Sequence, residues 1–366
     1  MASSKILIIS TNPFSYDGIS NVIVNYHGRI SDSRLMFDIA ICNSSAQERV
    51  GVLENIFSKV YVLPDRKQKL LNYSVALFNI IKKNNYDIIH VHGNSGTIAI
   101  ELLIALLSGV KKRIAHSHNS TCDNPRLHKF LKPIMNNLTT SNFACSKCAG
   151  DWLFSKKYTV LNNGIGTAQF LFSQSHRDYH RGKLNLKLKT VIGHVGHFTH
   201  QKNHDFIIQM YKELSEQQSN YHLLLIGDGP LLENVKHKIN EYGLSDSVTI
   251  LNKRNDVNEL LSAIDIFILP SHFEGLPLSG IEAQAAGLHC LVSDKISNEL
   301  NLTNTVKYLP IPNSEKWIEY ILSYDSSSRV EQSNNNVIAL KRMGYDIASN
   351  ANILTQCYLS MRCVDE

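Results

Sequence analysis

Hydrophobic and polar positions alternate along this chain in blocks that are typical of strands followed by helices. In the first half, short apolar runs of strand-like length recur at residues 5–10, 37–42, 59–63, 87–93, 112–118, 142–146 and 157–164. Helix-like segments fall between several of them, including 96–109 and 70–84, and in 70–84 the apolar residues recur at three- and four-residue steps. Such alternation of strands with amphipathic helices predicts βαβ units and a parallel sheet.

The alternation breaks once and then resumes. Residues 173–189 are polar and charged without a strong period, which predicts a linker, or a loop with a connector. A second set of strand-like runs then follows at 190–196, 221–229, 248–252, 264–271 and 289–294. Helices are expected between these runs, over 204–216 and 231–242 and starting at Val257 and Leu278.

Near the end of the chain, a polar stretch at 325–336 precedes a final helix-like segment over 345–361. The pattern therefore predicts an α/β protein with two Rossmann-like domains, over 1–185 and 186–344, and a terminal helical segment over 345–366. Two such domains would face each other across a cleft. Ligands of open α/β sheets bind outside the carboxyl ends of the strands, so the loops that follow strands are the best candidates for chemistry.

Composition agrees with this organisation. The chain has 366 residues, of which 43% are hydrophobic and 19% charged, an ordinary balance for two globular domains. The apolar run near residue 6 is too short for a signal peptide or a membrane span, and no other run approaches ~18 residues. Seven cysteines, an odd number, suggest free thiols in a reducing compartment, and for the single CxxC pair, Cys145 and Cys148, we favour packing over a metal or redox role. We therefore expect a soluble cytoplasmic protein.

Charge is distributed unevenly. Residues 1–190 contain 24 Lys and Arg against 11 Asp and Glu, a net charge of +13, within a chain whose total is +5. A basic first half can face a phosphorylated substrate, an anionic membrane surface or nucleic acid, although solubility alone is an alternative explanation.

The stretch FEGLPLSGIEAQAAG, which begins at Phe273, carries two acids at the end of a predicted strand. Glu274 lies in the loop and Glu282 about one turn into the next predicted helix. Gly275 allows a ligand to approach the backbone, and Pro277 suits a first helical turn, which leaves the amides of Leu278 and the next residue free for a phosphate. Carboxylates on either side would accept hydrogen bonds from sugar hydroxyls. The alternative is that both glutamates are solvated charges at a helix end.

Other loops after strands carry candidates of the same kind. Lys202 can place a cation on that phosphate, whereas the Gly-rich turn at 226–230 is a weak signal by itself. Two HxH pairs, at 90 and 92 and at 116 and 118, lie near the carboxyl ends of their strands and can act as hydrogen-bond donors or as general acids and bases. We expect no metal there, because no nearby carboxylate or cysteine pattern completes a ligand set.

Several stretches together resemble the retaining glycosyltransferases of family 4, especially the bacterial branch that builds exopolysaccharide, capsule and O-antigen. They are GHVGHFTHQKNHDFII, LLLIGDGPLLENVK, the segment from VTILNKRNDVNELL through FEGLPLSGIEAQAAGLHCLVSD, and, more thinly, DGISNVI, IIHVHGN, RIAHSHNS and VLNNGI. The resemblance covers nearly the whole chain. It implies the GT-B fold, with an acceptor-binding first domain, a nucleotide-sugar-binding second domain and a last helix that crosses back to the first domain.

The resemblance also implies residue roles. His118, Lys202 and Glu274 would be catalytic; Glu274 would contact the donor hexose and Glu282 the ribose of the nucleotide. The diphosphate would meet Lys202 and the amides around Leu276 and Leu278. The positions expected to bind the nucleotide sugar are Gly18, His197, Lys202, Arg254, Asn255, Val257, Glu274, Gly275, Leu276, Pro277, Leu278 and Glu282.

One position departs from the family pattern. His197 stands where the family usually has an arginine, and a neutral histidine would give less charge to the phosphates than an arginine would. The glycine loop at Gly18 would lie by the acceptor and phosphates, and Arg254 to Val257 would hold the uracil ring.

The expected function is transfer of a hexose from a UDP-sugar, with retention of configuration, to a hydroxyl of a lipid-linked saccharide or an oligosaccharide in surface polysaccharide synthesis. No cofactor, metal or nucleic acid is expected, and the basic first half would contact the anionic inner face of the plasma membrane peripherally. Two alternatives are a sugar-nucleotide epimerase of the same fold and a non-catalytic scaffold subunit that binds a sugar nucleotide. The donor sugar, linkage and acceptor are left open.

Overall fold

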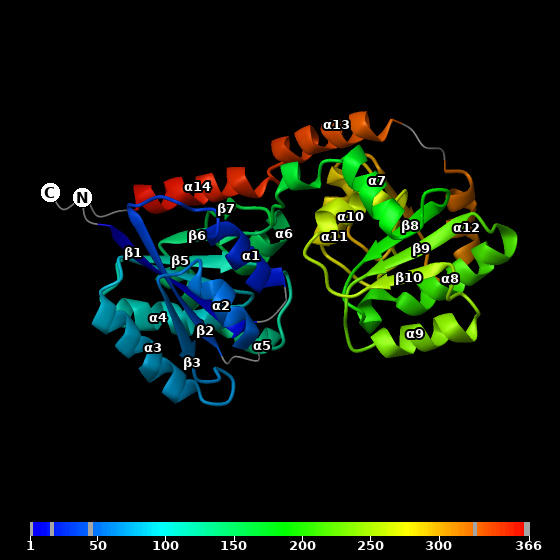
Figure 1. Cartoon of the computed structure of the whole chain (residues 1–366). Helices are drawn as coiled ribbons and strands as arrows, with labels where there is room; N and C mark the ends of the chain where they lie inside the picture. Colours follow the sequence, from blue (N-terminus) through cyan, green and yellow to red (C-terminus); the bar gives the residue numbers. More distant parts are fainter. Residues whose placement is uncertain (1–2, 15–17, 43–46, 325–327, 362–366) are drawn as a thin grey trace. The chain divides into compact units, whose positions relative to one another are not determined.

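The computed structural model describes residues 3–14, 18–42, 47–324 and 328–361 (Figure 1). The chain divides into two compact units. Unit 1 comprises residues 1–164 together with 347–366, and unit 2 comprises residues 165–346. The division therefore lies about twenty residues earlier than the boundary expected at 185, because the segment that follows it packs with the second sheet.

Unit 1 is built on a parallel sheet of seven strands in the order β3-β2-β1-β4-β5-β6-β7. The strands are β1 (Ser4–Pro13), β2 (Leu35–Cys42), β3 (Lys59–Leu63), β4 (Ile88–Gly93), β5 (Lys112–Ser117), β6 (Ser141–Ala144) and β7 (Thr159–Val160). The helices are α1 (Gly18–His27), α2 (Gln47–Glu54), α3 (Leu70–Asn84), α4 (Ala99–Leu107), α5 (Pro125–Leu138), α6 (Lys147–Leu153) and α14 (Ile347–Ser360), with a 3-10 turn η1 (Gly96–Ile98).

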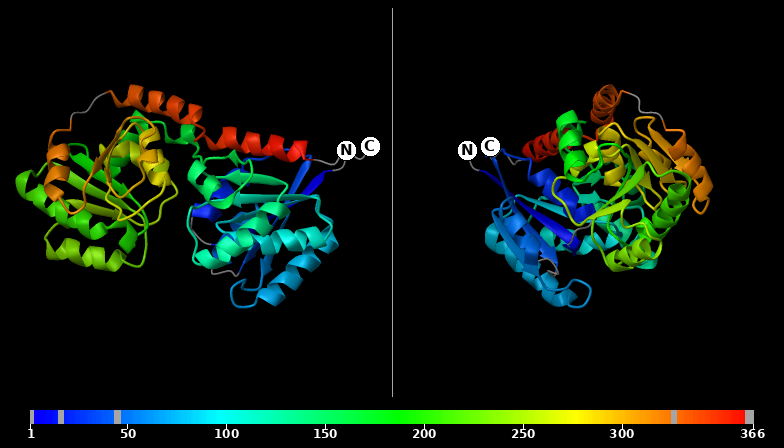
Figure 2. Two further views of the ribbon diagram at one scale, coloured as in Figure 1. Left: turned by 180° about the vertical axis from the view of Figure 1, so that it is seen from behind. Right: turned by 45° about the vertical axis from the view of Figure 1, so that its right-hand side comes forward.

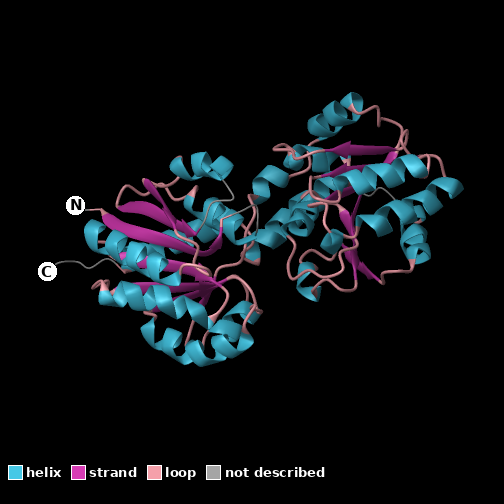
Figure 3. Cartoon of the chain, turned by 90° about the horizontal axis from the view of Figure 1, so that it is seen from below, coloured by secondary structure: helices cyan, strands magenta, loops and turns pink. Residues whose placement is uncertain are grey.

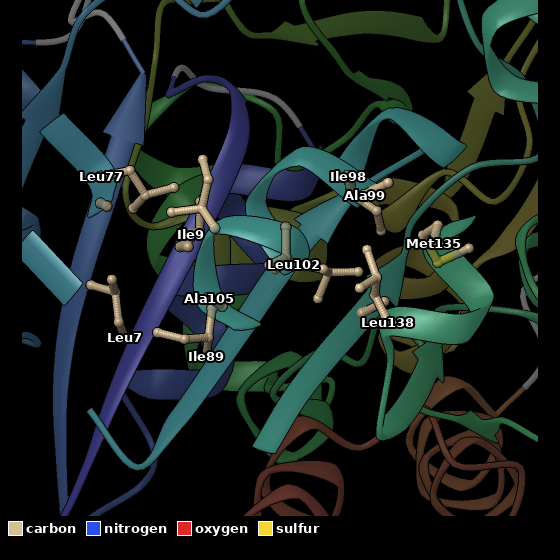
Figure 4. Packing of buried hydrophobic residues seen from close by; sticks show 14 of the residues in the cluster. Leu7, Ile9, Leu77, Ile89, Ile98, Ala99, Leu102, Ala105, Met135 and Leu138 are labelled. Carbon is tan, nitrogen blue, oxygen red and sulfur yellow. The ribbon is translucent and has the colours of Figure 1, made fainter. Parts of the chain in front are cut away.

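Both faces of this sheet are buried, which is why its strands read as continuous apolar runs. Leu7 and Ile9 of β1 point to the layer formed by α3 to α6, where they pack with helix residues such as Leu77 and Leu102 (Figure 4). The alternate residues Ile6 and Ile8 belong to the opposite core, shared with α1, α2 and α14. Strands are thus covered by helices on both sides, as Figure 3 shows from below.

The last helix, α14, belongs to unit 1, where it packs beside α1 (Figures 1 and 2). Its residues Ile347, Ala351, Leu354 and Tyr358 are buried in the core on that side of the sheet. The return of the chain end to the first domain, expected from the resemblance, is therefore confirmed.

Unit 2 has a parallel sheet of six strands in the order β10-β9-β8-β11-β12-β13. The strands are β8 (Thr190–Val195), β9 (Tyr221–Ile226), β10 (Val248–Leu251), β11 (Ile266–Leu269), β12 (His289–Ser293) and β13 (Val306–Leu309). The helices are α7 (Gln174–Lys183), α8 (His204–Gln217), α9 (Leu232–Glu241), α10 (Val257–Ala263), α11 (Leu278–Ala285), α12 (Ser314–Leu322) and α13 (Arg329–Arg342), with 3-10 turns η2 (Thr167–Phe170), η3 (His200–Lys202) and η4 (Asn298–Leu300).

The segment predicted to be a linker at 173–189 contains a helix, α7. The hydroxyl of Ser173 caps it by accepting a hydrogen bond from the amide of His176. The side of α7 that faces unit 2 carries two arginines. Arg177 Nη2 lies 2.5 Å from Asp265 Oδ1, and Arg181 Nη2 lies 2.7 Å from Asp265 Oδ2. Because charged rather than apolar residues of α7 face the rest of unit 2, its sequence lacks the hydrophobic periodicity that predicts a helix.

A helix also begins within the polar stretch at 325–336, where the hydrophobic pattern indicated none. Residues 325–327 lie outside the described part of the chain, and α13 begins directly afterwards, at Arg329. Ser333 and Asn336 face inward, where their side chains donate to the carbonyl oxygens of Ala285 and Gln284 at 2.6 and 2.7 Å. Hydrogen bonds to the end of α11, rather than apolar contacts alone, hold this helix in place.

Candidate functional site

The candidate site of unit 2 lies where its strand order reverses. β8 has β9 on one side and β11 on the other, so the chain leaves the carboxyl ends of β8 and β11 towards opposite halves of the sheet. Open α/β sheets bind ligands at such a switch point. The loop after β8 carries His197 and Lys202, and the loop after β11 carries Glu274, so the structure brings these predicted residues to one place.

The closest contact in this site is an ion pair between Lys202 and Glu274. Lys202 Nζ donates to Glu274 Oε1 at 2.5 Å, and the two side chains are only 16% and 12% exposed. The two loops are also joined through their backbones, since the amide of His272 donates to the carbonyl oxygen of Gln201 at 2.8 Å. Asn203, in the left-handed conformation at φ 56°, donates from Nδ2 to the carbonyl oxygen of Pro270 at 3.1 Å. Hydrogen bonds between the two loops, on either side of Lys202 in the sequence, therefore fix the positions of the Lys202–Glu274 ion pair.

The Gly-rich turn after β9 is essential to this packing. A Cβ atom on Gly227 would lie 2.0 Å from the carbonyl oxygen of Gly196, and one on Gly229 would lie 2.6 Å from backbone atoms of Phe198. Both glycines have φ near +150°. The loops after β8 and β9 touch through their backbones here, so the turn that looked like a weak signal in the sequence has a definite structural role.

The second predicted feature is the start of α11. Pro277 is the N-cap residue and α11 begins at Leu278, one position later than the first-turn placement expected for the proline. The first amides of the helix precede its internal hydrogen bonds, which start with the bond from the Gly280 amide to the Pro277 carbonyl oxygen. A Cβ atom at Gly275 would meet open space, and Leu276 packs on the core beside the helix. The exposed backbone before α11 can therefore receive an anion.

Glu282 lies in α11, half-buried and one turn beyond the helix start. Burial raises the pKa of its carboxyl to about 7, and the positive charge of Lys202 acts in the opposite direction. Lys202 thus lies within electrostatic reach of Glu282 while it is bonded to Glu274. One cation flanked by two carboxylates, next to a helix N-terminus, is suited to a ligand that has an anionic centre and hydroxyl groups on both sides.

His197 has a partner that the sequence pattern did not indicate. Its Nδ1 donates to Asp228 Oδ1 at 3.0 Å, and both side chains are more than half exposed. Asp228 belongs to the Gly-rich turn after β9, and its carbonyl oxygen also accepts from the amide of Phe198 at 2.6 Å. The only signal for Asp228 was its place inside that turn.

The remaining predicted residues of unit 2 lie at or just before the start of α10. Arg254 is exposed and forms a bidentate ion pair with Asp256, while Asn255 is exposed and Val257 is the first residue of α10. They follow β10, the edge strand of the sheet, and no hydrogen bond joins them to Lys202 or Glu274 among the described residues.

In unit 1, Gly18 is the first residue of α1, and His118 follows the end of β5. Gly18 thus follows β1, and His118 follows β5. In the sheet, β4 lies between these two strands, and the strand order reverses between β1 and β4. His118 Nε2 is 2.8 Å from His92 Nδ1, and burial lowers the pKa of His118 to about 3. His118 is therefore a neutral imidazole that belongs to a cluster of histidines.

Of the two CxxC cysteines, Cys145 is buried and Cys148 is exposed, and no disulfide joins any of the six cysteines within the described ranges. Among the described residues, two groups have the arrangement to hold a metal ion: one is His90, His92 and His116, and the other is His180, Asp256 and Glu259. Neither group includes a cysteine. No helix within the described ranges combines the length and hydrophobicity needed to cross a membrane.

Comparison with protein families gives two matches. Residues 176–334 match the family described as "Glycosyl transferases group 1", and residues 33–147 match the family described as "Glycosyl transferase 4-like". The first match contains Lys202, Glu274 and Glu282, and the second contains His92 and His118.

Two curated relatives are similar over most of their length. The chain is 27% identical over 378 residues to the putative glycosyltransferase EpsF of Bacillus subtilis (strain 168), covering 98% of this chain and 97% of that one. It is 28% identical over 246 residues to the UDP-Gal:alpha-D-GlcNAc-diphosphoundecaprenol alpha-1,3-galactosyltransferase of Escherichia coli, covering 63% of each.

Solved structures share the fold. HepE of Anabaena in complex with UDP superposes with a TM-score of 0.76 at 16% identity, covering 97% of this chain and all of the other. A putative UDP-N-acetylglucosamine 2-epimerase from Listeria monocytogenes superposes with a TM-score of 0.65 at 16% identity, covering 97% of this chain and 95% of the other. The fold is thus the GT-B arrangement of two Rossmann-like domains, which by itself does not separate a transferase from an epimerase.

Proposed function

Since this chain belongs to the glycosyl transferases of group 1 and carries a first unit of the glycosyl-transferase-4-like kind, we propose that it transfers a hexose from a UDP-sugar to a hydroxyl of a lipid-linked saccharide, with retention of configuration, in bacterial surface polysaccharide synthesis. The observation that best supports binding of a UDP-sugar donor is the Lys202–Glu274 ion pair, which lies at the switch point of unit 2 beside the start of α11. The E. coli relative uses UDP-galactose and a diphosphoundecaprenol acceptor, and HepE binds UDP, which supports both substrate kinds.

In this proposal the diphosphate of the donor lies at the start of α11 and takes Lys202 as its counter-charge. Lys202 and the first amides of α11 stabilise the negative charge that grows on the leaving diphosphate. Glu274, freed from Lys202, accepts hydrogen bonds from hydroxyls of the hexose, and Glu282 accepts from the ribose. A phosphate oxygen of the donor takes the proton of the attacking hydroxyl on the same face of the sugar. The transfer itself needs no metal, because the cation and the helix start supply the positive charge.

Roles in unit 1 follow from the resemblance. His118, as a neutral imidazole, offers one hydrogen bond to the donor sugar or its diphosphate, and the loop at Gly18 serves the acceptor and phosphates. In unit 2, His197 supports the diphosphate and the loop from Arg254 through Asn255 to Val257 serves the uracil ring.

Turnover of a UDP-sugar by matched variants tests the assignment. We expect Glu274→Ala and Lys202→Ala each to lower polymer synthesis by about 10²-fold or more, because each removes a group that acts on the sugar or its leaving group. The control is a second ion pair of unit 2, Lys236–Glu233, which is exposed on α9. Glu233→Ala and Lys236→Ala should retain full activity.

The outcomes separate the alternatives. Unchanged polymer synthesis in Glu274→Ala, with UDP-sugar binding intact, would identify a non-catalytic scaffold subunit. Release of an epimerised sugar without an acceptor would identify an epimerase. Transfer that requires acceptor and fails only in the Lys202 and Glu274 variants supports the proposal.

The acceptor side of the proposal includes peripheral contact with an anionic membrane. Three neighbouring helices of unit 1, α3, α4 and α5, expose apolar side chains. They are Leu70, Leu71, Val75, Leu103, Leu106, Leu107, Leu127, Phe130 and Ile134. The single acid in these three helices, Glu101, is buried against Arg66 at 2.6 Å, whereas Lys82, Lys83 and Lys129 are exposed. Exposed apolar groups with basic neighbours fit the surface of anionic lipid.

Co-sedimentation with vesicles tests this contact. We expect binding to vesicles that contain an anionic lipid, weaker binding as salt is added, and loss of binding in Phe130→Glu. Leu188→Glu, at an exposed leucine of unit 2, is the matched control and should bind normally. Binding that ignores both salt and Phe130→Glu would contradict this part of the proposal.

A further inference from the structure

Unit 1 contains a buried cluster of histidines that the proposed transfer uses only at its edge. His90 and His92 come from β4, and His116 comes from β5, where the strand register places it directly opposite His92. The rings of His90 and His116 stack at 5.4 Å, and those of His92 and His116 lie at 4.9 Å. The three side chains are at most 2% exposed. Alternation along the strands puts all three on the same face of the sheet.

The ring nitrogens of this cluster lack partners in the protein. Within the described ranges no residue forms a hydrogen bond with His90 Nε2, His92 Nε2 or either nitrogen of His116. An unpaired buried polar atom is destabilising, and native proteins keep few of them. A neutral imidazole has one nitrogen with a free lone pair, so these three touching rings can offer three buried lone pairs to an electron-pair acceptor such as a metal ion.

The three rings bring their nitrogens close together. One ring nitrogen from each of the three histidines lies within 4.8 Å of the other two. Zn–N bonds of about 2.0–2.1 Å in a tetrahedral site place ligand nitrogens roughly 3.4 Å apart. The three rings lie 10–33° from parallel, so they would turn towards one another to close the site around one ion. Two adjacent strands hold all three ligands, which gives the site a rigid base.

The opposite nitrogens of two rings are already bonded in the manner of metal ligands. His90 Nδ1 is 2.6 Å from the hydroxyl of Tyr358, and His92 Nδ1 is 2.8 Å from His118 Nε2. Such outer hydrogen bonds orient ligand rings and leave Nε2 for the ion.

We propose that His90, His92 and His116 form a three-histidine site for a borderline divalent transition-metal ion, Zn²⁺ in the first instance, within unit 1 and separate from the diphosphate site of unit 2. Three imidazoles suit Zn²⁺, Co²⁺ or Ni²⁺ and suit Mg²⁺ poorly, and they leave one coordination position open. The sequence argued against a metal because no carboxylate or cysteine was close enough to complete a ligand set. In the structure, His116 from the neighbouring strand supplies the third ligand instead.

Metal binding would also act on His118. A metal on His92 Nε2 fixes the proton of that ring on Nδ1, which then donates to His118 Nε2 at the observed 2.8 Å. His118 must in turn carry its own proton on Nδ1. The ion therefore selects the tautomer of the one histidine of the cluster that is partly exposed. His92 is a positioning residue for His118 in this scheme.

The test uses the full chain without an affinity tag, stripped with a chelator and titrated with Co²⁺ and Zn²⁺. We expect one ion per chain, visible absorption of tetrahedral Co²⁺, displacement by Zn²⁺, and three imidazole ligands in X-ray absorption. His90→Gln and His116→Gln should weaken binding at least tenfold. His128→Gln, at another buried histidine of unit 1, is the matched control and should bind as the wild type does.

Two results would overturn the site. One is the absence of stoichiometric Co²⁺ binding to the wild-type chain, which does not depend on how any variant folds. The other is loss of the ion in His180→Gln but not in His116→Gln, which would place it with Asp256 and Glu259 instead. Nitrogen chemical shifts of the imidazoles, recorded with and without Zn²⁺, test the tautomer of His118; unchanged shifts would contradict the coupling.

Discussion

At the scale of residues, the site depends on a few charges whose partners differ from those expected. Sequence reasoning identified Lys202, Glu274 and Glu282 correctly as neighbours, because all follow strands that meet at one switch point. It did not foresee that Lys202 would be bonded to Glu274 without a ligand. The distance between two loops far apart in the chain follows from tertiary packing, which no local pattern encodes.

His197 gives the first prediction. The family usually has an arginine here, and the histidine ring is tied to Asp228 instead. Replacing it with arginine adds a fixed charge and a fork of donors near the diphosphate, so His197→Arg should bind UDP about fivefold more tightly. Calorimetric titration of UDP into both proteins measures the change, with Arg in place of the exposed His237 as control. Weaker binding of UDP by His197→Arg would contradict the view that His197 acts on the diphosphate through its charge.

Glu282 gives a prediction about pH. Its pKa is about 7 in the folded protein against 4.5 for an ordinary glutamate, so the folded state holds this proton more tightly than the unfolded state. Both states are protonated below about pH 4.5, and as pH rises from there through 7 the protein loses at most about 3 kcal/mol of stability. Glu282→Gln has no carboxyl to titrate, so this pH-dependent loss of stability is absent from the variant. Its free energy of unfolding should therefore rise relative to that of the wild type between pH 5 and 8. Urea unfolding at four pH values, with Glu233→Gln as control, measures the difference; a gap that is constant with pH would refute the assignment.

At the scale of elements, α7 and α13 show why some helices were missing from the predicted pattern. The inward side of α7 carries arginines that pair with Asp265. The inward side of α13 carries a serine and an asparagine that donate to carbonyl oxygens at the end of α11, beside the apolar Val337 and Leu340. Helices with apolar inward sides were predicted closely: 70–84 agrees with α3, and the starts at Val257 and Leu278 agree with α10 and α11. Polar inward residues weaken the hydrophobic periodicity on which the prediction of a helix depends.

The turn after β9 gives a prediction at this scale. In Gly227→Ala the new Cβ would lie 2.0 Å from the Gly196 carbonyl oxygen, so the loops that carry His197 and Lys202 must separate. We expect a loss of about 3 kcal/mol or more, together with weaker UDP binding. Gly243 has a positive φ of 67° but open space around it, so Gly243→Ala should cost only about 1 kcal/mol. Similar melting temperatures for the two variants would show that the contact between the loops is unimportant.

At the scale of the whole molecule, both units repeat one plan, with their first six strands in the order 3-2-1-4-5-6 counted along each unit. Strand and helix alternation was enough to predict this architecture, and the carboxyl ends of strands were the right places to look for candidate residues. The boundary was harder to predict. Residues 173–189 were predicted to be a connector, but they pack in unit 2 with the rest of 165–346, while 347–366 pack in unit 1. With these boundaries the charge asymmetry shrinks to +8 for unit 1 and −3 for unit 2.

The most direct test of the central claim is thermal unfolding of the wild-type chain with a panel of UDP-sugars, alongside Lys202→Ala. A ligand that binds only the folded protein at 100 times its Kd adds about 2.7 kcal/mol of stability. We predict that at least one UDP-sugar raises the Tm by several degrees, and that the rise is lost in Lys202→Ala and kept in Lys236→Ala. No rise with any UDP-sugar at millimolar concentration, or an equal rise in Lys202→Ala, would contradict the account.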